Sequence, residues 1–243
     1  MQEYEIPKKE EHENSRQYVY RVLKDDILNW KYAPGEVIND LAISERLGVS
    51  RTPVREALFS LKTDHLVSIF ARNKTVVSLI DWQLIMEGKF VRTSLETLIA
   101  TDLCGKLTDQ VIGELSENLA LQRNLVEGGR GLHSFFELDN DFHRIIFHAA
   151  KKDETYKAVR RMCYQVDRVR SYMIPRANLI ENMMKHHVSI LEYIINGEKE
   201  KLAKTLEHHI NDIFHEDGEP ATFAINLLKA HPEYFSNVPE DLK

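Results

Sequence analysis

The stretch LGVSRTPVREAL, residues 47–58, contains a tight turn and the start of an amphipathic helix. Residues 48–50, Gly-Val-Ser, have the composition of the turn. We predict a helix over residues 52–64, because the Thr52 hydroxyl can cap the free amides at its start. Pro53 would then stand at the first helical position, where a missing N–H costs no hydrogen bond. The stretch therefore predicts a turn that leads directly into a helix carrying two arginines.

The segments before this turn predict two more helices. Residues 39–47 fit a short helix that ends at the turn. From Ser15 onward, apolar residues recur at helical spacing until Pro34-Gly35 ends the pattern. These apolar residues are Val19, Val22, Leu23 and Ile27. Two helices joined by a short turn that contains Gly are typical of a helix-turn-helix.

The segments after the third helix predict a β-hairpin. Residues 66–70 and 75–79 are rich in β-branched side chains and alternate in polarity. The polar tip 72–74 separates them, and its Asn can adopt a left-handed turn conformation. Three helices followed by a hairpin form a winged helix-turn-helix, which we predict for residues 15–80. Residues 1–14 are polar and are predicted to form an N-terminal arm.

Residues 81–243 show no further strand pattern and predict helices separated by short breaks. Connections this short force neighbouring helices to reverse, which indicates an antiparallel all-α helical bundle. The predicted fold class is therefore mainly α, a winged helix-turn-helix followed by an antiparallel all-α helical bundle over residues 81–243. The last dozen residues are predicted to be an irregular tail. The expected helices lie near 82–104, 108–127, 132–151, 153–173, 177–196, 198–216 and 220–230.

Charge is distributed unevenly along the 243 residues, whose net charge is −6. Residues 15–80 hold ten Lys/Arg against seven Asp/Glu, so a basic segment lies inside an acidic protein. No apolar run approaches the roughly 18 residues of a membrane span, and the polar N-terminus lacks a secretion signal. The two cysteines, Cys104 and Cys163, do not form a disulfide framework, so we expect buried thiols and a cytoplasmic location.

The start of the third predicted helix can read double-stranded DNA. The major groove admits one α-helix, and side chains at its N-terminus then meet base edges. Arg51 and Arg55 share a helical face and can grip guanine or phosphate, while Ser50 and Thr52 can bind phosphate oxygens. At the tip of the hairpin, Arg72 and Lys74 can reach the backbone or the minor groove. The alternative for each arginine taken alone is an ordinary solvated charge.

The motif of residues 47–58 closely resembles the recognition helix of the GntR family of bacterial transcription regulators, and the likeness spans about residues 15–80. The resemblance implies that Arg51, Thr52 and Arg55 contact operator DNA, with help from Ser50. Members often carry Glu and a basic residue at the start of the second helix. This chain has Asp40-Leu41 there, so we assign no base contact to that position.

A polar pair lies on the apolar side of the predicted helix FFELDNDFHRIIFHA, residues 135–149. Asp139 and His143 are one turn apart and share that side with Phe142 and Ile146. Both groups are expected to point inward, where an unpartnered carboxylate is costly. Asp141 lies off this line and is expected to be solvated.

Two further histidines are expected to reach the same point from the helices on either side of residues 196–197. His187 and His209 lie on the apolar sides of their helices, about 15 and 18 Å along the axes from Gly197. The spacing therefore brings Asp139, His143, His187 and His209 together. One carboxylate and three neutral imidazoles suit a divalent transition metal such as Zn, Ni or Mn. The alternative for any single histidine is a hydrogen-bonded core residue.

The pattern of these four residues also resembles the effector-binding domain of the FadR-like (FCD) branch of GntR regulators, over roughly residues 85–215. The resemblance implies that the Asp and three His hold a metal that helps to bind a small organic acid. Val91-Arg92-x-x-Leu95-Glu96 is similar to another motif of this branch, and Arg92 is the candidate for pairing with the effector carboxylate. Arg168 and Arg170 are weaker candidates for this pairing, because both are expected to be exposed on a charged helix. The resemblance thus implies that residues 81–243 form an effector-binding and dimerisation domain.

The leading functional hypothesis is a dimeric, ligand-responsive regulator and not an enzyme. Paired winged helices would read a palindromic operator, most simply as a repressor. An alternative is a metal-dependent hydrolase fused to a DNA-binding module, although HExxH, G-x-S-x-G and P-loop motifs are missing from the sequence. In a third reading the imidazoles bind the effector directly, without a metal.

Overall fold

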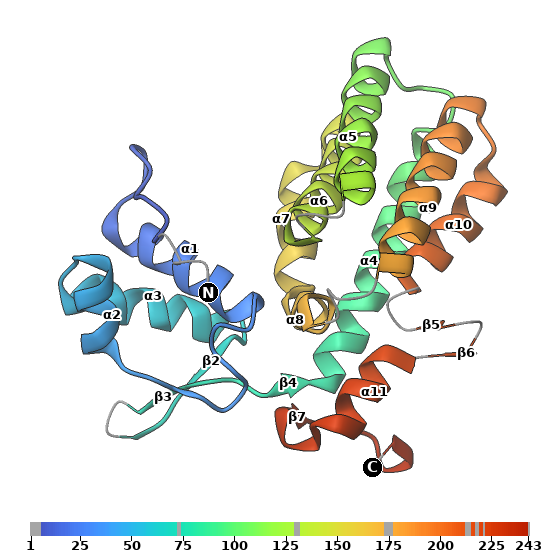
Figure 1. Ribbon diagram of the computed structural model, residues 1–243. Helices are drawn as coiled ribbons and strands as arrows, with labels where there is room; N and C mark the ends of the chain where they lie inside the picture. Colours follow the sequence, from blue (N-terminus) through green and yellow to red (C-terminus); the bar gives the residue numbers. More distant parts are fainter. Residues whose placement is uncertain are drawn as a thin grey trace. The chain divides into compact units, whose positions relative to one another are not determined.

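The computed structural model describes residues 6–71, 74–128, 132–172, 177–211, 215–216, 219–220 and 222–242. The chain divides into two compact units (Figure 1). The first consists of Met1–Gln83 together with His231–Lys243, and the second of Leu84–Ala230. The C-terminal segment thus groups with the first unit and not with the helical unit in which the sequence analysis placed it. No helix in the described part of the chain is long and apolar enough to cross a membrane.

The first unit contains the three predicted helices, α1 (Ser15–Leu28), α2 (Asp40–Leu47) and α3 (Arg51–Thr63). Asn14 and Gln17 form a capping box at the start of α1. Gly48 ends α2 with a φ of 64°, a left-handed conformation that glycine adopts without strain. The predicted N-cap of the third helix was wrong by two residues. Ser50 is the N-cap and Arg51 the first helical residue, so Thr52 lies inside the first turn.

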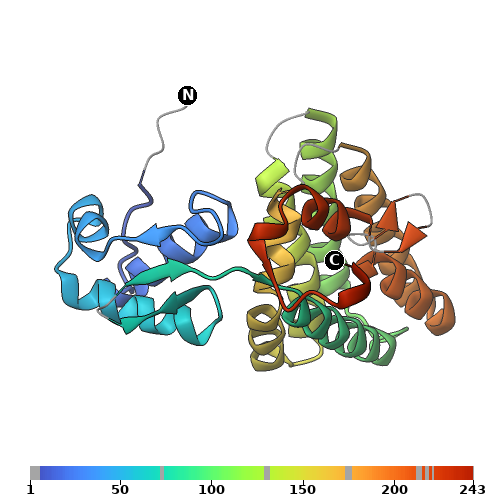
Figure 2. The same ribbon diagram turned by 90° about the horizontal axis from the view of Figure 1, so that it is seen from below.

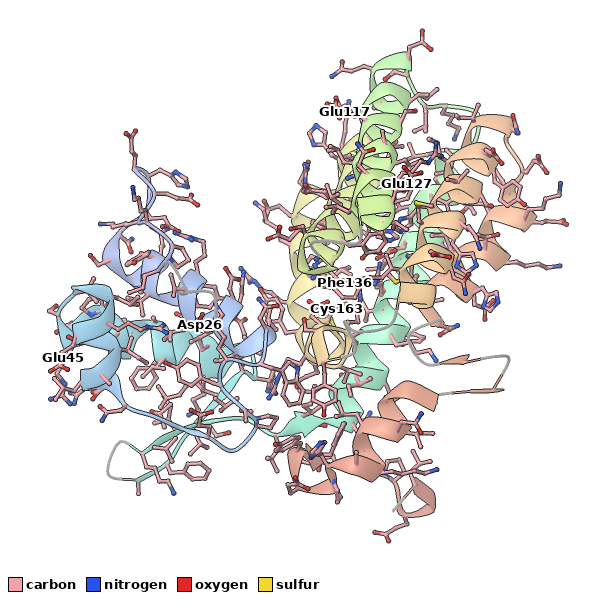
Figure 3. The ribbon with its side chains drawn as sticks, viewed as in Figure 1. Asp26, Glu45, Glu117, Glu127, Phe136 and Cys163 are labelled. Atoms are coloured by element: carbon pink, nitrogen blue, oxygen red, sulfur yellow. The ribbon has the colours of Figure 1, made fainter. Side chains whose placement is uncertain are left out.

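The core of the first unit lies where α1 packs against α3. The apolar residues that predicted these helices are buried there, and they include Val19, Leu23, Ile27 and Val54. One buried carboxylate, Asp26, ties α1 to the rest by accepting from Arg46 Nη2 at 2.6 Å and from Lys31 Nζ at 3.0 Å. Figure 3 shows Asp26 among these helices, with Glu45 on the outer side of α2.

The predicted hairpin is present as β2 (Val67–Ile69) and β3 (Thr75–Val77), which pair antiparallel. A strand that the sequence analysis missed, β1 (Val37–Ile38), pairs with the other edge of β3 (Figure 2). It has only two residues, too few for an alternating pattern. Arg72 and Asn73, at the predicted tip, lie outside the described residues.

The C-terminal segment is ordered, and the prediction of an irregular tail was wrong. A short 3₁₀ helix, η3 (Pro232–Tyr234), leads into β7 (Phe235–Ser236), which pairs in parallel with β4 (Ile80–Asp81). The prediction that no strand follows residue 80 was also wrong. The Phe235 ring packs 6.3 Å from that of Trp82, centroid to centroid. A second 3₁₀ helix, η4 (Glu240–Leu242), follows.

We expect Phe235→Ala to destabilise the first unit by about 3 kcal/mol, because it deletes a buried ring and leaves a cavity. Urea unfolding followed by tryptophan fluorescence measures the change, since Trp82 is next to the deleted ring. Glu233→Ala, an exposed substitution in the same segment, is the control and should change stability by less than about 0.5 kcal/mol. Equal effects of the two substitutions would contradict a structural role for the tail.

The second unit is built from helices that follow the predicted order. The predicted helix over 153–173 is two helices instead, because the chain breaks at Cys163. Two short strands, β5 (His215–Glu216) and β6 (Glu219–Pro220), pair antiparallel. The helices are α4 (Trp82–Asp102), α5 (Asp109–Gly128), α6 (Leu132–Ala149), α7 (Asp153–Met162), α8 (Tyr164–Tyr172), α9 (Ala177–Asn196), α10 (Lys199–Asn211) and α11 (Thr222–Ala230).

Within this unit α5 packs against α6 and α9, and α9 packs against α10. The shared core contains Phe142, Ile146, Ile190 and Leu206, which are residues of the predicted apolar sides. This packing turns one side of α6, α9 and α10 toward a common interior.

Candidate functional site

The side chains predicted to read DNA gather at the start of α3. Ser50, Arg51, Thr52 and Arg55 are exposed there, and Lys74 is exposed at the hairpin. Arg72 lies outside the described residues. A feature that the sequence analysis did not anticipate is Asp40, which accepts hydrogen bonds from both Arg51 and Arg55.

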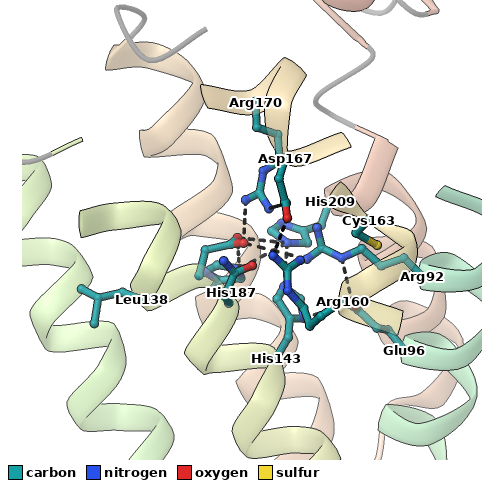
Figure 4. Close-up of polar contacts among 12 residues, drawn as sticks. Arg92, Glu96, Leu138, His143, Arg160, Cys163, Asp167, Arg170, His187 and His209 are labelled. Carbon is teal, nitrogen blue, oxygen red and sulfur yellow. Dashed lines mark hydrogen bonds and ion pairs between the residues drawn. The ribbon is translucent and has the colours of Figure 1, made fainter. Parts of the chain in front are cut away.

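The second site lies inside the helical unit, where four predicted side chains converge. Asp139 and His143 come from α6, His187 from α9 and His209 from α10, and all are buried. One potential ligand atom from each lies within 4.8 Å of the others. Figure 4 shows the histidines and the arginines around them. Exposed Asp141 stays outside this cluster.

The contact with Glu96 favours one tautomer of His143. Glu96 Oε2 lies 2.8 Å from His143 Nδ1 as an ion-pair contact, and Glu96 Oε1 accepts from Arg92 Nε at 2.7 Å. Because an ionised carboxylate offers no proton, this close contact favours the tautomer with the proton on His143 Nδ1. In the neutral ring the Nε2 atom is then unprotonated and has a lone pair available for a metal.

A relay of amides determines the tautomer of His187 in the same way. The carbonyl of Leu138 accepts from Asn118 Nδ2 at 3.0 Å, which fixes the orientation of the Asn118 amide. Asn118 Oδ1 then accepts from Gln122 Nε2 at 2.7 Å, so Gln122 Oε1 faces His187 Nδ1 at 2.8 Å. His187 Nδ1 must therefore donate, and its Nε2 is unprotonated.

These unprotonated nitrogens face His209. Its Nε2 lies 3.0 Å from His143 Nε2 and 3.2 Å from His187 Nε2. One proton on His209 could bridge to only one of them, whereas a cation accepts all three lone pairs. Within the described residues Asp139 Oδ1 accepts no hydrogen bond, and its nearest neighbour in the cluster, His187 Nε2 at 3.3 Å, is not a donor in this tautomer. The donor set therefore fits a divalent transition metal.

Two arginines flank Asp139 and keep it ionised. Arg170 Nη2 donates to Asp139 Oδ2 at 2.6 Å, and Arg92 Nη2 lies 3.9 Å from the same oxygen. Burial alone would raise the pKa of Asp139, but the charge of Arg170, assisted by Arg92, holds it well below its ordinary value. Burial likewise opposes ionisation of Glu96, yet Arg92 and His143 lower its pKa to about 2.

The prediction that Arg168 and Arg170 are exposed was wrong. Their side chains are buried, at 1% and 2% exposure respectively. The expectation rested on the charged character of the helix, but α8, which follows the break at Cys163, buries both side chains. Arg92 lies beside the cluster, with Nη2 3.9 Å from Asp139 Oδ2, and its pairing with an effector stays a prediction. The relay of Asn118 and Gln122 was missed. Both polar residues lie on the buried side of α5, and that position was the available signal.

Close packing brings α4 to the cluster. A Cβ added to Gly88 would lie 2.5 Å from the backbone oxygen of Met162, which leaves no space for a side chain. Cys163 Sγ also approaches Gly88 O at 3.8 Å. Arg92 and Glu96 follow one and two turns later on the same side of α4. Gly88 therefore sets the depth at which these two side chains enter the interior.

The buried histidines predict a pH dependence of the metal-free protein. Burial lowers the pKa of His187 from 6.5 to about 4 and also holds the pKa of His209 well below its ordinary value. The unfolded chain takes up protons near pH 6.5 that the folded protein accepts only near pH 4. Stability is therefore fully present above pH 6.5 and falls toward pH 4, by up to about 1.4 kcal/mol per pH unit per histidine.

Urea unfolding in a chelator across pH 4.5–7.5 measures this slope. We expect His187→Gln to reduce it, because one titrating group is removed, and the exposed His208→Gln to leave it unchanged. A slope that is the same in the wild type and His187→Gln would show that the buried imidazole does not remain neutral.

Two domain families match this chain. The FCD domain matches residues 90–212, and the family described as bacterial regulatory proteins, gntR family, matches residues 15–77. The winged helix-turn-helix and the helical domain together define a DNA-binding transcription regulator with a domain for small-molecule effectors, which is not an enzyme class. The chain belongs to the GntR family, in the branch with an FCD domain. The hydrolase alternative is therefore set aside.

Known relatives agree with this assignment. The chain is 28% identical over 197 residues to the HTH-type transcriptional repressor RspR of Escherichia coli, covering 81% of this chain and 86% of that protein. It is 29% identical over 133 residues to the Nta operon transcriptional regulator of Aminobacter aminovorans, covering 55% and 62% of the two chains.

Solved structures share the fold. The protein McbR/YncC of E. coli superposes with a TM-score of 0.71 at 20% identity, covering 82% of this chain and 94% of that one. A putative GntR transcriptional regulator from Rhodococcus gives a TM-score of 0.67 at 20% identity, with 81% and 94% covered.

Proposed function

We propose that this protein is a homodimeric repressor that binds a palindromic operator and is controlled by a small carboxylate held at a metal centre. The observation that carries the proposal is the convergence of Asp139, His143, His187 and His209. The contacts of His143 and His187 favour the tautomers that leave Nε2 available to a metal. The repressor assignment is supported by the relative RspR, whose name describes a repressor.

DNA reading is assigned to the exposed start of α3. Arg51 and Arg55 are placed to contact base edges or phosphates in the major groove, with Ser50 and Thr52 on the backbone. At the hairpin, Lys74 and Arg72 would contact the adjacent backbone or minor groove.

Dimerisation is supported by an apolar stripe on α4. Met86, Phe90 and Leu98 recur at spacings of four or eight residues, and all are exposed, Phe90 at 71%. Large apolar side chains aligned on one exposed helical face are typical of an interface. A second copy of the chain is the partner that a palindromic operator requires, because its two half-sites mirror a two-fold axis.

The effector is assigned from the charge of the metal site. Three carboxylates balance three guanidinium groups around the cluster, so a divalent ion adds two positive charges that these carboxylates do not offset. The carboxylates are Asp139, Glu96 and Asp167, and the guanidinium groups are Arg92, Arg170 and Arg160. A carboxylate effector would supply negative charge. Arg92 is the candidate partner, since a guanidinium matches carboxylate geometry. When bound, the metal would act as a Lewis acid toward a carboxylate oxygen of the effector.

Control of DNA binding follows from differential affinity. The effector can release or recruit DNA only to the extent that it binds the DNA-competent and incompetent arrangements differently. For a repressor released by its effector, the carboxylate binds the incompetent arrangement more tightly.

The test uses fluorescence anisotropy on a labelled duplex selected by the protein from a random-sequence pool. Acetate, malonate and citrate are added as mono-, di- and tricarboxylate probes, with and without Ni²⁺. At least one acid should weaken DNA binding in the presence of Ni²⁺ and lose this effect in Arg92→Gln. If the acid weakens DNA binding equally with Ni²⁺ and in chelator, the imidazoles bind the acid without a metal.

A further inference from the structure

The two arginines at the start of α3 share one carboxylate. Arg51 Nη2 donates to both oxygens of Asp40, at 2.8 and 2.9 Å, and Arg55 Nε donates to Asp40 Oδ2 at 2.9 Å. Asp40 is the first residue of α2. Its place is fixed because the Asn39 side chain accepts hydrogen bonds from two amides of the same helical turn. The first residue of α2 therefore holds two arginine side chains from the start of α3.

The bridge leaves the outer end of Arg55 available. Within the described residues, Arg55 Nη1 and Nη2 make no hydrogen bond, and each arginine side chain is 49% exposed. A pair of terminal guanidinium nitrogens is the fork that guanine O6 and N7 accept. Asp40 thus binds Arg55 through Nε and leaves Nη1 and Nη2, the reading fork, free to contact a base.

The surface around Asp40 and Arg55 is hollowed. A hollow of about 240 Å³ is lined by Asp40 and Arg55 together with Phe59 and Lys74. Phe59 is itself exposed on α3. The carboxylate is therefore beside the surface on which a duplex would lie, and not on the opposite side of the unit.

We propose that Asp40 is a positioning residue that determines the sequence specificity of DNA binding, an inference that rests on the proposed role of Arg51 and Arg55. Two physical effects support it. Ordering the arginines before binding reduces the rotamer entropy that recognition must remove. In addition, one carboxylate offsets one of two positive charges, which weakens the sequence-independent attraction to phosphates.

Asp40 is ionised in the free protein. Burial alone would raise its pKa, but hydrogen bonds from Arg55 and Arg51 outweigh burial and lower it. The negative charge is thus present throughout the neutral pH range. The bridge from Asp40 to the two arginines therefore does not act as a pH switch.

The test compares Asp40→Asn and Asp40→Ala with Glu45→Gln in the full-length protein. Glu45 is an exposed acid on the same helix, so its substitution removes equal charge without touching the arginines. Anisotropy gives the dissociation constants for a duplex selected by the wild type from a random pool and for a shuffled duplex, each at two salt concentrations. Circular dichroism establishes that each variant is folded.

We expect both Asp40 variants to reduce the ratio of specific to shuffled affinity by at least about tenfold, because the reading fork is no longer oriented. Affinity for the shuffled duplex should rise or hold, with a steeper salt dependence. Asp40→Glu, which retains a carboxylate, should recover part of the ratio, and Glu45→Gln should leave it within about twofold. A ratio unchanged in both Asp40 variants would overturn the proposal.

Substitution of Arg55 separates the proposed DNA contact from the role of Asp40. If Arg55→Ala binds the selected duplex as tightly as the wild type, the proposed DNA contact is wrong and the role of Asp40 falls with it. If Arg55→Ala loses affinity while the Asp40 variants keep full discrimination, the contact stands and only the Asp40 inference is rejected.

Discussion

Loading metal-stripped protein with Ni²⁺ or Zn²⁺ should raise its melting temperature by roughly 10 °C. A ligand present at about a thousandfold excess over its dissociation constant stabilises the folded state by about 4 kcal/mol. For a chain of this size each kcal/mol corresponds to about 2–4 °C. The stabilisation arises because the folded protein presents three imidazoles and a carboxylate at one point, and the unfolded chain does not.

The readout is the metal-induced shift within each variant, so that a change in basal stability does not confuse the result. His209→Gln removes a nitrogen that faces both other imidazoles and should abolish most of the shift. His208→Gln, one residue earlier and exposed, should preserve it. Equal shifts in the two variants would place the ion elsewhere.

Replacing Arg55 with Ala should weaken binding to the selected duplex by about 10- to 100-fold. A bidentate contact with a base contributes about 1–3 kcal/mol of discrimination. Arg51→Ala should have a comparable effect if it contacts a base, or a smaller one that is uniform across sequences if it contacts phosphate. Anisotropy on selected and shuffled duplexes separates these outcomes.

Lys62→Ala is the matched control, because Lys62 is an exposed cation in the last turn of the same helix. It removes one positive charge but lies away from the N-terminal turn. A loss equal to that of Arg55→Ala would mean that the helix contributes only diffuse charge. The salt dependence should then fall equally in both variants.

The sequence was sufficient for those features that depend on periodicity. The helix-turn-helix followed from the turn at Gly48 and the apolar spacing of α1, and both were confirmed. Asp139 and His143 were predicted to face inward because they share a side with Phe142. The convergence of His187 and His209 followed from equal axial distances on either side of Gly197, since α-helix rise is constant.

Features that depend on contacts between distant segments could not be read in this way. The pairing of β4 with β7 joins residues about 155 positions apart through two-residue strands, which leave no pattern. The helix break at Cys163 occurs without Gly or Pro. Arg170 was expected to be exposed because its helix is charged, whereas its burial depends on the contact with Asp139 on α6. Asp40 is separated from Arg55 by fifteen residues, and only the packing of α2 against α3 brings them together.

Positions that orient other side chains were the hardest to predict. Gln122 and Asn118 have no meaning as a pair in sequence, because their roles depend on the carbonyl of Leu138 and the ring of His187. The sequence predicted no role for Glu96, which belongs to the motif of residues 91–96. In the structure it links Arg92 to His143, and so connects the candidate effector contact to the candidate metal ligand.

X-ray absorption at the edge of the bound metal, recorded on purified protein and on His187→Gln, tests the central claim most directly. Elemental analysis should give one metal per chain. The wild-type spectrum should then fit three imidazole nitrogens and at least one carboxylate oxygen, from His143, His187, His209 and Asp139. The variant should lose one imidazole from the same centre. A full complement of imidazoles in the variant, or no metal in a wild-type protein supplied with Ni²⁺, would contradict it.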